Sequence, residues 1–474
     1  MHCVSWLLLS NARIPGFEET RVQSISEMIH VYASGWFALN EPAVFDLDLG
    51  TADTARSDVV RPGSNIIEVE PNQIRVVTSS RNLTPIYLGR DQASTQFVVG
   101  TDLPTVAAAL TTITGNSPEL SDEIGIMLSS SSSVRGIERI EHCTEILFRK
   151  SGSDWKITRN RLADPLKKHP VEFVDSLTSG TAQISALRTV IDECVLGKQD
   201  VGVLVSGGVD SGLVAALLAV TGVPCTAYTL GTPWGDEFSE AFEMTTSIGL
   251  SLCRISLSAD EIVAALPATV RAFGHGDPET VAIGVAITAF CQVANNKPLL
   301  LLTGYGSDLI NSGMSTEADI QGDIETNVLR AVHRTRYSSE FTATAARANG
   351  YRLVHPYWDN RVLEVALRTN AAVKCAFGRE KGHLRLAAER FLPSAVAWRK
   401  KIAIHHGNGL AANLEALIDS HTGVNSSAGQ VYRAMLIEQI RSAVTNPHAA
   451  LPGHEVYERA VAVVGYTHKS HKKL

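Results

Sequence analysis

The stretch VGVLVSGGVDSGLVAA, Val201 to Ala216, decides the fold of this 474-residue chain. Its first five residues are apolar and predict a buried strand. The serine and two glycines that follow end this strand, and the last apolar residues predict a helix. Such a unit directs backbone N–H groups and the positive end of the helix at one point. Ser206 and Ser211 add hydroxyl donors there, and Asp210 adds a carboxylate that can hold Mg²⁺. The stretch therefore predicts a cradle for a pyrophosphate group.

Alternating patterns around this stretch predict an α/β protein. Helical and strand-like segments alternate, which is typical of a parallel sheet flanked by helices, at residues 182–196, 213–220, 226–230 and 299–302. The remaining C-terminal part is mostly helical in pattern and is expected to cover the sheet. The N-terminal part instead carries short β-type segments separated by turns. A polar segment with two prolines, residues 163–170, marks the expected boundary between domains at 1–165 and 170–474.

Composition narrows the class of protein and of partner. Hydrophobic residues make up 45% of the chain and charged residues 19%, as in ordinary globular proteins. The net charge of −7 argues against a nucleic-acid partner, and no apolar run is long enough to cross a membrane. The seven cysteines are scattered without a Cys-x-x-Cys pair, which predicts reduced thiols in a cytoplasmic protein. A small molecule is the expected partner, and a homo-oligomer is left open.

The glycine loop and five later segments resemble one family. No Gly-Lys-Ser/Thr follows the loop, so it is not a Walker loop. Its SGGVDS sequence instead resembles the ATP pyrophosphatases, which split ATP between its α and β phosphates. Segments at matching spacing lie at residues 231–241, 303–308, 355–359, 378–381 and 398–405. Together they resemble the β-lactam synthetases and carbapenam synthetases, the branch of the asparagine synthetase superfamily that forms amides within one molecule. Asparagine synthetases proper usually carry a glutamate where this chain has Tyr305.

The resemblance implies a fold of two units. It implies an N-terminal αββα domain, similar to the Ntn hydrolases and to glutamine amidotransferases but degenerate. It also implies a C-terminal ATP-pyrophosphatase domain with a parallel sheet and a helical covering. A glutaminase would need a cysteine that presents its own free amine, and here His2 precedes Cys3. We therefore expect the glutaminase site to be lost and the N-terminal domain to be structural.

The resemblance also implies the residues that bind the nucleotide and the metal. Contacts with ATP are expected from Val205, Ser206, Gly207, Gly208, Asp210, Ser211, Leu230, Gly231, Gly304 and Lys381. Asp210 and Asp308 each follow a predicted parallel strand, at the end where such sheets bind ligands. Two carboxylates there suit a Mg²⁺ that bridges the triphosphate, although each alone is more often a helix cap or turn residue.

Three further residues are implied to catalyse amide formation. Tyr305 and Glu340 resemble the pair that removes a proton from the attacking amine. A tyrosine with a pKa near 10 is a poor base, so we expect nearby cations to lower it and Glu340 to accept or orient the proton. Considered alone, Glu340 fits a surface residue better. Lys401 lies in the matched segment WRKKI and is implied to stabilise the developing oxyanion.

Several positions depart from the family pattern. Gly212 stands where a second serine is usual, which is expected to remove one phosphate contact. Asn311 and Ser312 replace an apolar residue and a glycine, and are expected to line or back the substrate side. Ala403 and His406 stand where glycine and glutamate are common. None of these changes removes a residue assigned to catalysis.

These observations predict an ATP-dependent carbon–nitrogen ligase. Mg-ATP and an amino-acid-derived carboxylate are expected to form an acyl-adenylate and pyrophosphate, and an amine of the same molecule then closes a β-lactam ring, as in antibiotic or toxin biosynthesis. Two alternatives remain open. The product could be another amide, such as a macrolactam of the lasso-peptide type or an intermolecular amide. The chain could also be a catalytically silent nucleotide-binding regulator.

Overall fold

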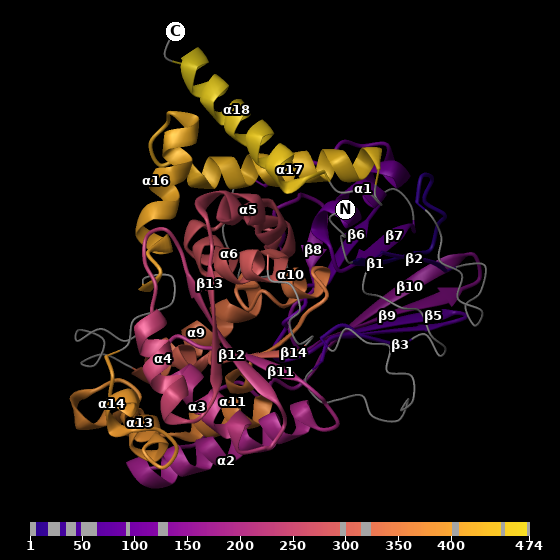
Figure 1. The fold of residues 1–474 in the computed structure, drawn as a ribbon. Coiled ribbons are helices and arrows are strands. Elements are labelled where there is room, and N and C mark those ends of the chain that lie inside the picture. The colour runs from indigo at the N-terminus through magenta and orange to yellow at the C-terminus, as the bar shows by residue number, and fades with distance from the viewer. Residues whose placement is uncertain are drawn as a thin grey trace.

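Two antiparallel sheets form the N-terminal part of the protein (Figure 1). The computed structural model describes residues 6–17, 29–34, 44–48, 64–91, 95–121, 131–293, 300–313, 324–400, 407–446 and 451–471. The first sheet has the order β2-β1-β7-β6-β8, with strands β1 Trp6–Ser10, β2 His30–Ser34, β6 Tyr87–Arg90, β7 Phe97–Gly100 and β8 Ile137–Arg139. The second has the order β10-β9-β5-β4-β3, with strands β3 Val44–Asp46, β4 Ile66–Glu70, β5 Gln73–Thr78, β9 Thr144–Ser151 and β10 Asp154–Arg161.

These two sheets stack face to face around a hydrophobic core. Alternation of apolar and polar residues along the strands directs one face of each inward, and the rings of Phe97 and Phe148 meet there with centroids 4.4 Å apart. Helix α1 (Leu103–Thr114) covers the outer face of the first sheet. The outer face of the second sheet carries ion pairs such as Arg75 with Glu68 and Glu145, and no described helix covers it. The described residues thus contain two sheets and one helical layer of the expected αββα sandwich.

The C-terminal part contains the predicted parallel sheet, in the order β13-β12-β11-β14-β15. Its strands are β11 Val201–Leu204, β12 Cys225–Gly231, β13 Ser251–Ser256, β14 Leu300–Thr303 and β15 Arg352–Val354. In register, Val203 of the central strand pairs with Ala227 on one side and Leu302 on the other. The central strands β11 and β14 are buried along their whole length because helices pack on both faces of the sheet, whereas the edge strand β13 is largely exposed.

Two groups of helices cover this sheet. One face packs against α2 Ser176–Val195, α3 Val209–Ala219, α11 Asn360–Arg368 and α13 Gly382–Ala388. The other packs against α5 Ala259–Phe273 and α6 Pro278–Val293, beyond which lie α16 Leu410–Thr422, α17 Ala428–Thr445 and α18 Gly453–His471. The other described elements are α4 Phe238–Ser247, α7 Ser307–Ile310, α9 Ile324–Ser338, α10 Ala343–Ala348, α12 Ala371–Lys374, α14 Ser394–Ala397, and the 3-10 turns η1 Pro356–Trp358 and η2 Ala376–Gly378.

One hydrophobic core joins the N-terminal and C-terminal parts. It includes Leu8 of β1 and Val106 of α1 together with Phe273 of α5 and Ile440 of α17. The boundary expected at residues 165–170 lies in the segment between β10 and α2. Because the core crosses this boundary, the N-terminal sheets pack firmly against the helices that cover the parallel sheet.

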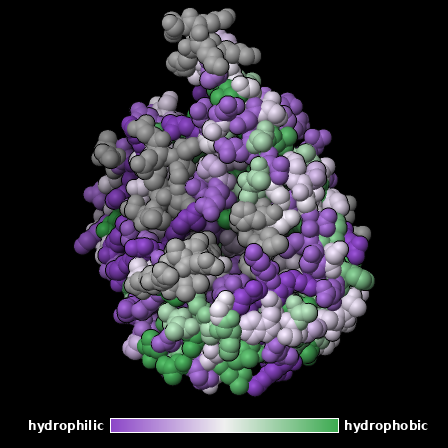
Figure 2. Space-filling view, turned by 90° about the vertical axis from the view of Figure 1, so that its left-hand side faces the viewer, coloured by the Kyte–Doolittle hydropathy of each residue, from purple (hydrophilic) through white to green (hydrophobic). Residues whose placement is uncertain are grey.

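The surface is mixed in polarity. Polar residues predominate in the upper part of the face shown in Figure 2, and apolar residues gather at its lower end, at the level of α13 and α14. Among the helices that the structure describes, none combines the length and hydropathy needed to span a bilayer.

Candidate active site

The glycine loop joins β11 to α3 and presents the end of that helix. Gly207 has a left-handed backbone (φ 73°), and a Cβ atom there would lie 2.5 Å from the backbone carbon of Glu240, so a larger residue does not fit. The backbone N–H of Ser206 donates to the Ser211 hydroxyl at 3.2 Å. No side chain in the described part of the chain caps α3, whose first residue follows Gly208. A helix start without a side-chain cap is a suitable place for an anionic group.

The ends of two neighbouring strands lie beside this loop. Because β12 and β14 flank β11 in the parallel sheet, Gly231 and Gly304 come next to the loop. A Cβ atom on Gly304 would lie 2.4 Å from the backbone nitrogen of Ser211, which explains the glycine. The side chains of Val205 and Leu230 lie in the cores on opposite sides of the sheet. Only backbone atoms of these two residues can therefore contact a nucleotide.

The two expected metal ligands meet at one buried lysine. Asp210 lies in the first turn of α3, Asp308 lies in α7, and Lys381 precedes α13 with a left-handed backbone (φ 60°). The Lys381 ammonium is fully buried, lies 2.5 Å from Asp210 Oδ2 and also forms an ion pair with Asp308. The fold thus brings together all three of these residues. In the described residues, no cluster of three or more His, Cys, Asp or Glu side chains is arranged for a metal.

Gly313 is a site residue that the sequence did not reveal. A Cβ atom there would lie 2.1 Å from Asp308 Oδ1 and 2.4 Å from Lys381 Cε. Only a bare backbone allows the carboxylate and the lysine to approach each other here. The sequence offered no signal beyond the presence of a glycine after the GYGSD turn.

Tyr305 and Glu340 lie near each other and near Asp308. Tyr305 is partly exposed as a residue, and the carboxylates of Glu340 and Asp308 both act electrostatically on its hydroxyl. Glu340 is 2% exposed, so the alternative of a surface residue is wrong. Its role in the catalytic pair stays a prediction. One carboxylate oxygen accepts a hydrogen bond from the Thr335 hydroxyl at 2.9 Å, and the other lies 3.5 Å from the Arg334 guanidinium.

The expected lowering of the tyrosine pKa is wrong. Burial, reinforced by the carboxylates of Glu340 and Asp308, raises the pKa of Tyr305 well above 10, and the charge of Arg334 opposes this only in part. Burial also raises the pKa of Glu340 above 4.5, although the hydrogen bond from Thr335 and the charge of Arg334 act to lower it. A phenolate is therefore disfavoured, and the carboxylate of Glu340 is the better proton acceptor.

A buried histidine holds this pair in place. His355 Nε2 donates to the Phe341 carbonyl at 2.9 Å, so its Nδ1 accepts from the Thr303 hydroxyl at 2.7 Å. The Thr303 oxygen in turn accepts from the backbone N–H of Tyr305 at 3.1 Å. Burial lowers the pKa of His355 to about 3, which keeps the ring neutral as this pattern requires. One imidazole thus ties the turn before Tyr305 to the residue after Glu340.

Three arginines anchor the segment that leads to Lys401. The fully buried Arg385 donates to the carbonyls of Ala397 and Arg399, both at 2.8 Å, and Arg379 donates to the Trp398 carbonyl at 2.8 Å. Arg399 in turn donates to the carbonyl of Gly207 at 2.8 Å, which joins this segment to the glycine loop. Lys401 itself lies outside the described residues, as do Cys3, Ala403 and His406.

The expectation for Gly212 is also wrong. A Cβ atom at this position would contact Leu392 Cδ1 and Met244 Cγ, both at 3.3 Å, so a serine here would point into the core and away from the phosphate cradle. Asn311 and Ser312 directly follow α7 and are buried, and Asn311 Nδ2 donates to the Ser307 hydroxyl at 3.2 Å. Their expected place at the substrate side stays a prediction.

Comparison with known proteins agrees with this arrangement. The carboxyethyl-arginine beta-lactam-synthase of Streptomyces clavuligerus is 27% identical over 242 residues, which cover 50% of this chain and 47% of that protein. A putative glutamine-hydrolyzing asparagine synthetase of Methanocaldococcus jannaschii is 25% identical over 263 residues, 47% of this chain and 48% of that protein. Asparagine synthetase B of Escherichia coli is 23% identical over 257 residues, which cover 50% of this chain and 46% of that protein. The chain spans about half the length of these curated relatives.

A family model supplies the broader assignment. The asparagine synthase model matches residues 184–345 and 329–445, which together span more than half of the chain. These residues contain the glycine loop, the acidic pair with its lysine, the Tyr305–Glu340 pair and the arginine-anchored segment. The chain belongs to the asparagine synthase family.

Proposed function

We propose that this protein uses ATP to activate a carboxyl group of an amino-acid-derived substrate and then closes an amide bond within that molecule to form a β-lactam. The observation that carries the proposal is the place of Tyr305, near the buried Glu340 carboxylate and near Asp308 at the carboxyl end of the parallel sheet. The similarity to a β-lactam synthase supports it. A ligase of this family needs a phosphate-binding site and a proton acceptor close together, and we propose the glycine loop and Glu340 for these two roles.

In the first step the protein positions the triphosphate. An oxygen of the substrate carboxylate attacks the α-phosphorus of ATP, the bond to the bridging oxygen breaks, and pyrophosphate leaves. The N–H groups of the glycine loop and of α3 bind the phosphate oxygens. Asp210 and Asp308 would hold a Mg²⁺, since two carboxylates with phosphate oxygens are its usual donors, and its charge would offset that of the pyrophosphate. Lys381, once freed from between the carboxylates, supplies a further positive charge to the leaving group.

In the second step the protein moves a proton. The substrate amine attacks the activated carbonyl carbon, and the Tyr305 hydroxyl accepts the amine proton as it donates its own to the Glu340 carboxylate. The bond between the carbonyl carbon and the AMP oxygen then breaks, and AMP leaves. Because burial raises the pKa values of both residues, the proton ends on Glu340 without a free phenolate. Lys401 is proposed to stabilise the oxyanion.

The test is an assay with purified protein, ATP, Mg²⁺ and carboxyethyl-arginine, the compound in the name of the Streptomyces relative. We expect release of pyrophosphate and AMP and a product lighter than the substrate by one water. The Tyr305→Phe variant keeps the ring that packs edge-on against Phe341 (centroids 5.2 Å apart) and should retain ATP–pyrophosphate exchange while losing amide formation.

Other outcomes would replace the proposal. Amide formation only with added ammonia, glutamine or a second amine would show an intermolecular ligase. A large cyclic product from a peptide substrate would show a macrolactam synthetase. Nucleotide binding without pyrophosphate release, across a panel of amino-acid-derived carboxylates, would favour a regulator. Unchanged amide formation in Tyr305→Phe would overturn the proton-transfer step.

A further inference from the structure

The C-terminal end of α9 is held by side chains from remote parts of the chain. The last four carbonyls of a helix lack partners within the helix. Here Thr335 O accepts from the Ser338 hydroxyl at 3.2 Å, and Ser338 O accepts from His275 Nε2 at 2.8 Å. The two carbonyls between them, of Arg336 and Tyr337, accept from Arg139 at the end of β8 and from Asn82, which lies between β5 and β6. All four carbonyls are therefore satisfied by side chains.

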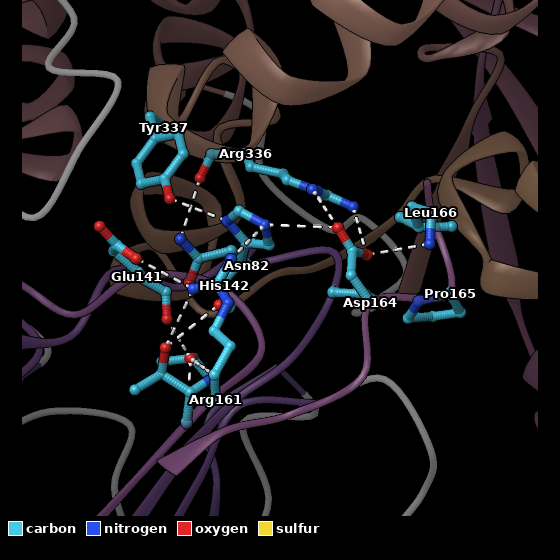
Figure 3. A network of polar contacts seen from close by, with 12 residues as sticks. Asn82, Glu141, His142, Arg161, Asp164, Pro165, Leu166, Arg336 and Tyr337 are labelled. Atoms are coloured by element: carbon cyan, nitrogen blue, oxygen red, sulfur yellow. Dashed lines mark hydrogen bonds and ion pairs between the residues drawn. The ribbon is translucent and has the colours of Figure 1, made fainter. Parts of the chain in front are cut away.

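Arg139, the last residue of β8, makes the central contact. Its guanidinium donates to Tyr337 O at 2.5 Å and to Arg336 O at 3.1 Å, and it lies 5.5 Å from the centre of the Tyr337 ring. Asn82 Nδ2 donates to Arg336 O as well, at 3.1 Å (Figure 3). Arg139 is only 4% exposed and pairs with no carboxylate among the described residues. Burying an arginine without a carboxylate is costly, and the negative end of the α9 dipole is what offsets its charge.

The N-terminal part also contacts the side chains of the last turn of α9. Figure 3 shows the Arg336 guanidinium donating to both oxygens of Asp164, at 2.8 and 2.9 Å, and His142 Nδ1 lying 2.8 Å from the Tyr337 hydroxyl. Burial would raise the pKa of Asp164, but its contacts with His142 and Arg336 hold that pKa well below its usual range. The last turn of α9 is thus fixed through both its backbone and its side chains.

Glu340 is attached directly to this fixed turn. After α9 the chain reverses through Ser339, which has a left-handed backbone (φ 57°). The Glu340 N–H then lies 3.4 Å from the Ser338 hydroxyl, and the Glu340 carboxylate contacts Thr335 and Arg334, both in the last turns of α9. The position of the carboxylate therefore follows the position of the helix end.

We propose that Arg139 is a positioning residue for the Glu340 carboxylate, and that the N-terminal sheets serve the amide-forming step by holding the end of α9 through Arg139 and Asn82. This inference rests on the proposed function for its catalytic consequence. Its structural part does not depend on any substrate.

The structural part is tested by hydrogen exchange on the full chain. Arg139→Met replaces the arginine by a side chain of similar length that has no hydrogen-bond donors. It should accelerate hydrogen exchange in a peptide covering residues 334–346 and leave the exchange rate of α3 unchanged. Arg159→Met is the matched control, since Arg159 is on the neighbouring sheet, its side chain is 41% exposed, and it pairs with Glu138. Unchanged exchange at residues 334–346 in folded Arg139→Met would overturn the proposal. If this variant does not fold, Asn82→Gly keeps the left-handed backbone (φ 50°), removes the second donor to Arg336 O, and is judged by the same criterion.

The catalytic part is tested by separating the two half-reactions with carboxyethyl-arginine as the probe. A misplaced catalytic group can cost about 10²-fold in rate, so we expect Arg139→Met to slow amide formation by at least about tenfold. ATP–pyrophosphate exchange and the KM for ATP should change by less than about twofold, because the phosphate cradle is on other elements. Arg139→Lys keeps the charge but not the fork, so it should restore activity only in part. Parallel losses in both half-reactions would show a merely structural role. A wild-type protein that forms no amide would refute the proposed function instead and leave the exchange result intact.

Discussion

Replacement of Lys381 by methionine removes the only ammonium that the described residues place between Asp210 and Asp308. The lysine is fully buried and Asp210 is 7% exposed, whereas the Asp308 side chain is 26% exposed. Methionine has a similar length and no charge. The change therefore leaves two neighbouring carboxylates without their shared counter-ion while adding no bulk.

The expected loss of stability follows from the geometry. Coulomb's law with an effective dielectric constant of about 20 gives roughly 7 kcal/mol for the Lys381–Asp210 pair at 2.5 Å. Much of this offsets the desolvation of the two groups, and removing one partner of a buried pair typically costs about 3–5 kcal/mol. Because Asp308 is partly solvated, we expect a loss near the lower end, about 3 kcal/mol.

Thermal melting with and without Mg²⁺ checks this reasoning. In Lys381→Met the ion meets two carboxylates that no ammonium occupies, so Mg²⁺ alone should raise the melting temperature more than in the wild type. At about 100 times its Kd, a ligand stabilises by about 2.7 kcal/mol. Lys168→Met is the control, because Lys168 is 71% exposed and its 3.0 Å pair with Glu325 is worth at most about 1 kcal/mol. The reasoning is wrong if Lys381→Met has the same melting temperature as the wild type, or if Mg²⁺ raises the melting temperatures of both proteins equally. The lysine would then not occupy the place of a bound cation.

Three further predictions concern single features. Thr335→Val removes the hydrogen bond that lowers the pKa of Glu340. The acidic limb of the pH profile for amide formation should therefore move to higher pH. An acidic limb at the same pH as in the wild type would contradict the assignment of Glu340 as proton acceptor. Gly212→Ser should lower stability by about 1–3 kcal/mol without strengthening ATP binding, because the serine would point into the core. Tighter binding of ATP by this variant would show that a serine at position 212 does contact the phosphates. Stability should fall by about 2 kcal/mol per buried histidine between pH 7.5 and pH 5. In the unfolded chain a histidine binds a proton below about pH 6.5. In the folded chain burial lowers the pKa values of His275, His355 and His383 to about 4, 3 and 3, so these rings take up no proton over this range. A melting temperature independent of pH would contradict this for His275, His355 and His383.

Much of the fold could be predicted because its signals are local. The apolar run before Ser206 and the apolar helical pattern after Asp210 correspond to β11 and α3, and the alternation of patterns corresponds to the parallel sheet. The unit of strand, glycine turn and helix was predictable for the same reason, since its three parts follow one another within 16 residues of sequence, 201–216. The roles of Val205 and Leu230 were less predictable, because only the packing of the sheet shows that their side chains are buried in the cores.

The electrostatic predictions fared less well because they depend on remote segments. Tyr305 was expected to have a lowered pKa, yet its neighbours are carboxylates and its hydroxyl is desolvated, which raises it. Gly212 follows the loop in sequence, but the helix turns that position toward Leu392 in the core. No local pattern predicted Gly313, Arg139 or Arg399, since each acts on a backbone or side chain from another segment.

The sequence by itself determined the alternation of strands and helices around residues 201–216, the glycine loop and the residue types that the chemistry requires, because periodicity and turn chemistry act over a few residues. Only the tertiary structure decided which of those residues meet and with what charge around them. Lys381 reaches Asp210 across 171 residues of chain, and Arg139 reaches Tyr337 across 198. Desolvation and Coulomb interactions depend on distances in space, so the pKa values and the anchoring of Glu340 emerge only when the three sheets pack together.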